Sequence, residues 1–186
     1  MRYTIVEFVH DFLKDKIKKG DLCIDATAGN GHDTKYLCEQ VGEIGRVISI
    51  DIQKKAVENT EKLLFNSALD NIATVVLDSH ENINMYAEEN TVSVIMFNLG
   101  YLPGGDHNLK TKSESTITAL EKSLKLLKSG GILSVCIYSG GDSGFEERDA
   151  VLDYLGTLNS RIYNVIKSEF YNKPNNPPIP VFILKS

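Results

Sequence analysis

The amino-acid sequence predicts an α/β protein built on a doubly wound, mostly parallel sheet of seven strands with a C-terminal antiparallel hairpin. Three observations predict this fold. Short apolar runs alternate with segments of helical periodicity over most of the chain. A turn that contains glycines follows the first apolar run and precedes a helix-like segment. The last two apolar runs have no helix between them, which favours antiparallel pairing at one edge.

The first half of the chain alternates between helices and strands. Apolar residues at helical spacing predict a helix over 3–19, which Gly20 ends. Short apolar runs predict strands over 21–25, 46–51 and 72–77, and helices are expected over 32–41 and 53–68. The buried stripe of the last of these helices is expected to consist of Ala56, Val57, Leu63 and Leu64.

The second half continues the alternation. An apolar run predicts a strand over 92–98, and a helix with a stripe of isoleucine and leucine follows over 112–128. Gly130 and Gly131 are expected to end that helix. The remaining elements expected are a strand over 132–138, a helix over 145–158, and strands over 161–171 and 180–185 joined by the proline-rich segment 174–178.

Size and composition favour one domain over residues 1–186, onto which the N-terminal helix packs. The net charge of −5 disfavours broad, nonspecific binding of nucleic acid. Cys23, Cys38 and Cys136 are too scattered for a disulfide framework or a zinc site, so no metal is expected. No apolar run is long enough to span a bilayer, and the charged N-terminus does not resemble a signal peptide. A cytoplasmic location without a membrane partner is therefore expected.

Polar residues close four of the expected parallel strands. Asp25, Asp51 and Asp78 follow the first three apolar runs, and Asn98 ends the fourth. The carboxyl ends of parallel strands meet at one rim of an open sheet, where ligands bind. The sequence therefore predicts a ligand site that these four residues share.

The turn after the first strand indicates which ligand binds there. Gly29 and Gly31 match a dinucleotide fingerprint, but Thr34 stands where its third glycine would be. Asp25 and Asp33 place negative charge beside the turn, which would repel a pyrophosphate. S-adenosylmethionine is cationic and free of phosphate, and its ribose hydroxyls suit Asp51. It is the expected cofactor.

The same residues resemble the class I S-adenosylmethionine-dependent methyltransferases, whose fold is Rossmann-like. Residues 25–31 look like the first motif of that family, with Thr27 in place of the more usual glycine. Asp51 matches the acid that binds the ribose, and residues 78–80 match the position on the adenine side. The cofactor-binding residues expected on these grounds are Asp25, Thr27, Gly29, Asn30, Gly31, Asp33, Asp51, Gln53, Asp78, Ser79, His80 and Asn98.

The segment after the fourth strand resembles the Asn-Pro-Pro-Tyr loop of amino-group methyltransferases. Asn98 and Tyr101 are kept, whereas Leu99 and Gly100 replace the two prolines. The resemblance implies that Asn98 accepts a hydrogen bond from the target amine and that Tyr101 stacks on the substrate. The general base is left open between Asp106, His107 and solvent. The expected catalytic residues are Asn98, Tyr101, Asp106 and His107.

A closer resemblance rests on the runs 25–34 and 98–107 together with residues 176–178. They are similar to small bacterial methyltransferases long labelled rRNA methylases. Characterised members of that family methylate the amine of 5-aminomethyl-2-thiouridine at the wobble position of tRNA, so a tRNA anticodon loop is the implied substrate. The glycine loop 139–144 lacks a histidine that the family carries there, which leaves the role of this loop open.

Alternative functions remain. The acceptor could be rRNA, a protein or a small amine, because these features are shared among such enzymes. A nicotinamide-dependent oxidoreductase is compatible with Asp51 but disfavoured by Thr34 and the acidic turn. A non-catalytic module could keep the cofactor fold. The edge hairpin or the N-terminal helix could support a homodimer.

Overall fold

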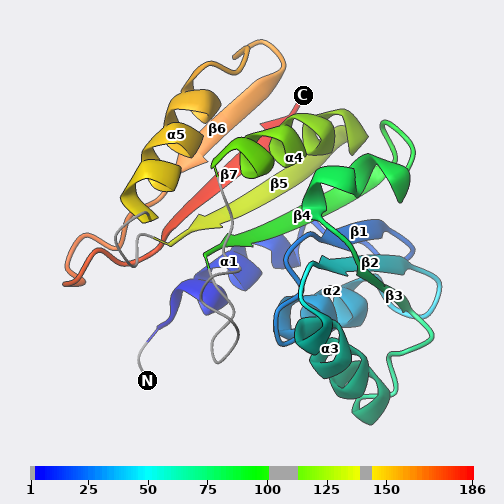
Figure 1. The fold of residues 1–186 in the computed structure, drawn as a ribbon. Coiled ribbons are helices and arrows are strands. Elements are labelled where there is room, and N and C mark those ends of the chain that lie inside the picture. Colours follow the sequence, from blue (N-terminus) through cyan, green and yellow to red (C-terminus); the bar gives the residue numbers. More distant parts are fainter. Residues whose placement is uncertain (1–2, 101–112, 139–143) are drawn as a thin grey trace.

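The computed structural model describes residues 3–100, 113–138 and 144–186. Within them, seven strands form one sheet in the order β3-β2-β1-β4-β5-β7-β6 (Figure 1). β1 to β5 are parallel to one another, whereas β7 is antiparallel to both β5 and β6. This topology confirms the predicted doubly wound, mostly parallel sheet with an antiparallel C-terminal pair.

The bounds of the elements follow the predicted order. The strands are β1 (Leu22–Asp25), β2 (Arg46–Asp51), β3 (Ala73–Leu77), β4 (Val92–Leu99), β5 (Leu127–Ile137), β6 (Tyr163–Lys167) and β7 (Ile179–Lys185). The helices are α1 (Ile5–Lys14), α2 (His32–Val41), α3 (Lys54–Asn66), α4 (Ser113–Leu126) and α5 (Gly144–Gly156), with a short 3₁₀ helix η1 (His80–Met85) that the sequence pattern did not predict.

The expected helix over 3–19 is too long. It begins after Thr4, whose hydroxyl accepts the Glu7 N–H while the Glu7 carboxylate accepts the Thr4 N–H, a capping box. It ends at Lys14, and the N–H of Ile17 then bonds to the Leu13 carbonyl. Ile17 still lies in the core, because the turn keeps its side chain on the buried side.

The prediction that Gly130 and Gly131 end a helix is wrong. α4 ends at Leu126, and β5 begins at the next residue and continues through both glycines. The pairing register with β4 shifts between Val92 and Val94, where the extra residues of β5 form an irregularity. The glycine pair therefore lies within this irregular stretch of strand, and periodicity alone could not distinguish it from a helix end.

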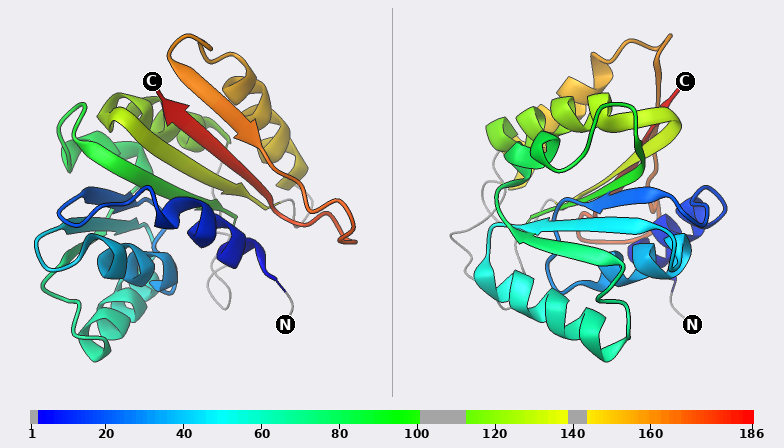
Figure 2. Two further views of the ribbon diagram at one scale, coloured as in Figure 1. Left: turned by 180° about the vertical axis from the view of Figure 1, so that it is seen from behind. Right: turned by 90° about the vertical axis from the view of Figure 1, so that its right-hand side faces the viewer.

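Two helical layers enclose the sheet (Figure 2). Successive side chains of a strand point to opposite faces of the sheet, so the side chains of β4 contact both layers. Ile95 and Phe97 pack in a core with α4 and α5, whereas Val94 and Met96 pack in a core with α1, α2 and α3. Because β4 is covered on both faces, its central residues 94–97 are continuously apolar rather than alternating.

Gly31, directly before α2, lets two helices approach closely. Its φ is 80°, and a Cβ there would lie 2.9 Å from the Thr60 Cα of α3. Gly31→Ala should therefore lower the free energy of unfolding by roughly 2–5 kcal/mol, the sum of left-handed strain and overpacking. Gly130→Ala is the matched control, because Gly130 has a φ of 75° and open space around its Cβ position. It should cost only the strain, about 1–2 kcal/mol. Equal losses in urea unfolding would contradict this explanation.

A search of the described part of the chain for a membrane-spanning helix is negative: none combines the required length and hydropathy.

Candidate active site

The four polar residues predicted to share a rim do meet at the carboxyl ends of the parallel strands. The backbone ties these ends together, since the Ala28 N–H bonds to the Ile50 carbonyl and the Asp78 N–H to the Asp51 carbonyl, at 2.9 and 3.0 Å. The Ala26 N–H bonds to the Met96 carbonyl of β4 at 2.9 Å. The glycine turn after β1 is thus fixed between the ends of β2 and β4.

Asp51 organises the turn from the end of β2. One carboxylate oxygen accepts the backbone N–H of Gly29 and the other accepts that of Gln53, each at 2.9 Å. Gly29 can present its N–H in this way because its φ is 57°, a conformation that glycine adopts without strain. A carboxylate has about four acceptor positions, so both oxygens can still accept hydroxyl groups from a ligand.

Asp25 lies beneath the turn and is fully buried. Its oxygens accept the Thr34 hydroxyl at 2.6 Å and the Thr27 N–H at 3.2 Å, and Thr34 also bonds to the Ser49 hydroxyl at 2.7 Å. Burial, and then the charge of Asp33, raises the pKa of Asp25 to about 7. Asp25 therefore supports the turn from inside, and its contact with a cofactor stays a prediction.

The raised pKa of Asp25 predicts a pH dependence of stability. An unfolded aspartate ionises near pH 4, whereas folded Asp25 stays protonated up to about pH 7. The folded state thus binds more protons between these values, and its stability from this group falls as pH rises from 4 to 7. The free energy of unfolding of Asp25→Asn relative to the unsubstituted protein should therefore increase over this range. Urea unfolding at several pH values measures it, and a constant difference would contradict the shift.

The side chain of Thr27 makes a contact that the glycine usual at this position of the motif could not make. Its hydroxyl accepts the backbone N–H of Asn98 at 2.7 Å. This bond joins the turn after β1 to the end of β4 across the rim. The side chain of Asn98 donates to Asp33, at the start of α2, at 2.5 Å. Both the backbone and the amide of Asn98 are thereby fixed.

Two residues of this network were missed from the sequence. His10 of α1 contacts the other oxygen of Asp33 at 2.6 Å, and its ring stacks on Tyr36 of α2 with centroids 3.7 Å apart. A histidine on an amphipathic helix gave little reason to place it at a rim formed by distant strands. The available sequence signal for this position was that His10 directly follows Val9, a residue of the buried face of the helix.

Asp78 anchors the segment after β3. It accepts the Ser79 N–H, the Asn82 amide and the Tyr86 hydroxyl, at 2.7, 2.9 and 2.6 Å. The bonds from Tyr86 and Asn82 hold the pKa of Asp78 below its usual value. The Ser79 hydroxyl in turn accepts the Glu81 N–H and so caps η1. Asp78 and Ser79 therefore shape one wall of the rim.

The ring of His80, at the start of η1, packs against β4. Its ring meets Phe97 edge-on at 5.8 Å between centroids, and its buried Nε2 has no hydrogen-bond partner within the described residues. Burial lowers the pKa of His80, so the ring is neutral at pH 7. A neutral imidazole with an unsatisfied nitrogen is suited to a polar atom of a nucleobase.

The remaining residues predicted to form the site either lie beside the helices α2 and α3 or lie outside the described residues. The Asn30 side chain accepts the Asn59 amide of α3 at 3.0 Å, and Gln53 stands directly before α3. Gly31 precedes α2 and packs against Thr60. Tyr101, Asp106 and His107 lie outside the described residues, as does most of the glycine loop 139–144.

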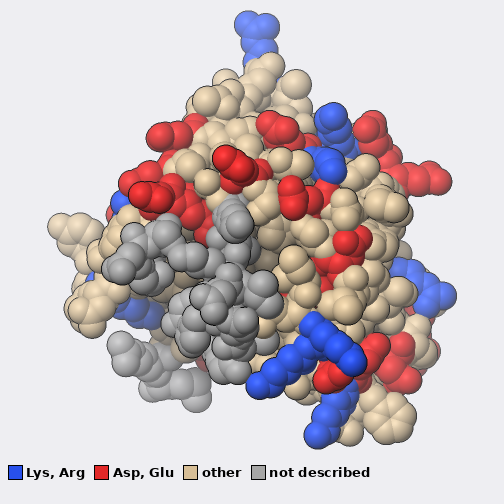
Figure 3. All heavy atoms as spheres, in the orientation of Figure 1, with Lys and Arg blue, Asp and Glu red and all other residues tan. Residues whose placement is uncertain are grey.

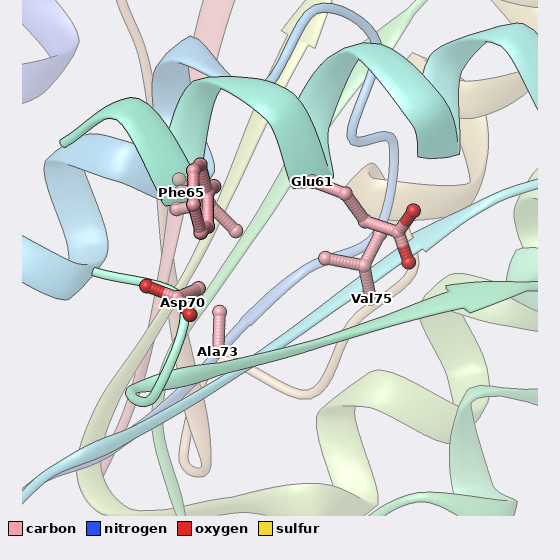
Figure 4. A pocket seen from close by; sticks show the side chains of 6 residues that line it. Glu61, Phe65, Asp70, Ala73 and Val75 are labelled. Atoms are coloured by element: carbon pink, nitrogen blue, oxygen red, sulfur yellow. The ribbon is translucent and has the colours of Figure 1, made fainter. Parts of the chain in front are cut away.

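A separate hollow of about 290 Å³ lies between α3 and the edge strand β3. Phe65 and Glu61 of α3 face it, and Asp70 lies before β3 (Figure 4). None of the residues predicted to bind a cofactor lines it. The rim at the strand ends, and not this hollow, is therefore the candidate site.

Comparison with known proteins agrees with this architecture. A family model described as "Putative rRNA methylase" matches residues 47–184. The chain belongs to this family. A methylase-family relative from Arabidopsis thaliana is 35% identical over 99% of this chain and 70% of its own length. It is named tRNA (mnm(5)s(2)U34)-methyltransferase, chloroplastic.

Two solved structures match the methylase fold over the full length of both chains. A putative rRNA methylase from Clostridium thermocellum is 45% identical with a TM-score of 0.96. A putative methyltransferase from Streptococcus mutans, crystallised with S-adenosylhomocysteine (SAH), is 34% identical with a TM-score of 0.89. These matches confirm the predicted family resemblance and the Rossmann-like methyltransferase fold.

Proposed function

We propose that this methylase transfers the methyl group of S-adenosylmethionine to the aminomethyl nitrogen of 5-aminomethyl-2-thiouridine at the wobble position of tRNA. The observation that carries the proposal is the 35% identity, over 99% of the chain, to a methyltransferase named for tRNA position U34. The rim supports it, because it combines carboxylates suited to a cationic nucleoside with an amide suited to an amine.

The residues of the rim fit the cofactor. Asp51 has acceptor positions for the ribose hydroxyls, Gly29 has no Cβ to keep the cofactor from the backbone of the turn, and His80 offers a neutral nitrogen on the adenine side. The S. mutans relative, which was crystallised with SAH, supports the choice of cofactor. When bound, the cofactor supplies a methyl group that its sulfonium has already activated.

The protein then has to position an amine and remove its proton. The carbonyl oxygen of the Asn98 amide accepts an N–H of the amine and aims the nitrogen lone pair at the methyl group. Tyr101 stacks on the uracil ring. An alkylamine arrives mostly protonated, and the proton passes to Asp106, His107 or solvent before the nitrogen attacks. Alignment and proton removal are therefore the contributions proposed for this segment.

Surface charge disfavours approach of the tRNA over α4 and α5. Acidic side chains gather over α4 and α5 (Figure 3). The exposed acids on these helices are Glu114, Glu121, Glu146, Asp149 and Asp153. They would repel phosphates, so this face is a poor docking surface for RNA. A wobble base splayed out of the anticodon loop can enter the rim without contact between the tRNA and this face.

The test uses tRNA from cells that lack the terminal methylation. The purified protein is incubated with this tRNA and methyl-labelled S-adenosylmethionine, and the nucleosides are identified by mass spectrometry. We expect labelled 5-methylaminomethyl-2-thiouridine, and none when the tRNA is digested beforehand. Labelling of rRNA or protein alone, with the cofactor bound, would overturn the tRNA assignment. Tight binding of NAD without S-adenosylmethionine would overturn the methyltransferase assignment as well.

A further inference from the structure

A continuous chain of contacts runs from the N-terminal helix to the acceptor amide. The Nε2 of His10 lies 2.6 Å from one carboxylate oxygen of Asp33. The other oxygen of Asp33 accepts the side-chain amide of Asn98 at 2.5 Å. Asp33 itself is 9% exposed, so water competes little for these bonds. α1, α2 and β4 each contribute one residue to this chain.

The carboxylate decides how the Asn98 amide is oriented. A carboxylate only accepts hydrogen bonds, so Asn98 must turn its NH₂ group towards Asp33. The carbonyl oxygen of the amide then points away from Asp33. The Asn98 backbone N–H bonds to the Thr27 hydroxyl at 2.7 Å, which fixes the backbone that carries this side chain. The carbonyl oxygen is the group that a target amine needs as an acceptor.

His10 completes the arrangement from the other side. Its Nε2 must carry a proton to bond with Asp33, so it donates to the carboxylate. The ring is stacked on Tyr36 at an interplanar angle of 4°, and the Tyr36 hydroxyl donates to the His10 carbonyl at 2.8 Å. Tyr36 therefore fixes both the ring and the backbone of His10, and His10 fixes the carboxylate.

We propose that His10 and Asp33 are positioning residues, which hold the Asn98 amide with its carbonyl oxygen towards the methyl acceptor and thereby make the N-terminal helix part of the active site. The proposal rests on the proposed function, in which an amine is the acceptor. It assigns to α1, which carries no residue of the predicted cofactor motif, a role in turnover beyond packing.

The test separates turnover from binding. Asp33→Asn lets either end of the Asn98 amide face position 33, so kcat with aminomethyl tRNA should fall roughly 10–100-fold, the cost of a misplaced catalytic group. His10→Ala should also lower kcat. His10→Gln restores an N–H donor near the Nε2 position and should recover most of the lost kcat. For both His10 variants, the dissociation constant for S-adenosylmethionine and the KM for tRNA should stay close to those of the unsubstituted protein.

Thr4→Ala is the control for loosened packing. It removes the capping box of α1 but touches neither His10 nor Asp33. It should lower Tm and leave kcat unchanged at a temperature where the protein stays folded. If kcat follows Tm across all variants, or if His10→Gln is no better than His10→Ala, the positioning role is refuted. If the unsubstituted protein does not methylate the tRNA, the proposed function itself fails, and the positioning role fails with it.

Discussion

Asn98→Ala should lower the kcat for amine methylation by roughly 100–1000-fold, the usual cost of removing one preorganised polar group that acts in the transition state. The affinity for S-adenosylmethionine should change little. The backbone N–H of residue 98 can bond to the Thr27 hydroxyl whatever the side chain is, so the backbone at the end of β4 should keep its conformation. Single-turnover kinetics with saturating cofactor measure the change.

A matched substitution tests whether the loss is specific. Asn164→Ala makes the same change on the exposed edge strand β6, far along the sheet from the rim. It should leave kcat unchanged. If Asn98→Ala kept more than half of the original kcat, the acceptor role of Asn98 would be wrong. If cofactor affinity fell in parallel with kcat, Asn98 would instead act by binding the cofactor.

Asp51→Ala should weaken the binding of S-adenosylmethionine by about 1–3 kcal/mol, roughly 5–150-fold in Kd. Two losses contribute. The ribose hydroxyls lose a charged acceptor, and the N–H groups of Gly29 and Gln53 lose the carboxylate that fixes the turn. Asp51→Asn keeps the size and one acceptor oxygen, so its loss should be the smaller. Isothermal titration calorimetry gives both values.

The control for Asp51 is an acid outside the rim. Asp70 lines the hollow between α3 and β3, and Asp70→Ala should leave the affinity unchanged (Figure 4). Unchanged affinity in Asp51→Ala would refute the ribose assignment. Equal losses in Asp51→Ala and Asp70→Ala would indicate a general electrostatic effect instead of a direct contact.

The rim could be predicted from the sequence because its signals are local. Apolar runs that end in Asp25, Asp51, Asp78 and Asn98 indicate strand ends, and parallel strands bring their carboxyl ends to one edge. No further packing information was needed for that step. Most elements were placed within a few residues for the same reason. The exceptions are the C-terminal end of α1, the start of β5 before Gly130 and Gly131, and η1, which was not predicted.

The details of the site could not be predicted, because they depend on contacts between distant residues. Nothing local shows that Asp25 turns inward, since its partners Thr34 and Ser49 come from a helix and another strand. The contact between His10 and Asp33 spans 23 positions and depends on how α1 packs against α2. Hydrophobic spacing predicts that α1 is a helix with a buried face, but not which polar side chain reaches the rim.

The central claim is that the rim at the strand ends binds a sulfonium nucleoside, and a crystal structure of the protein with SAH tests it most directly. We expect the ligand at the rim, with its ribose hydroxyls on Asp51, its adenine beside His80 and its sulfur facing Asn98. An empty rim at a saturating ligand concentration, or ligand only in the hollow between α3 and β3, would contradict the claim.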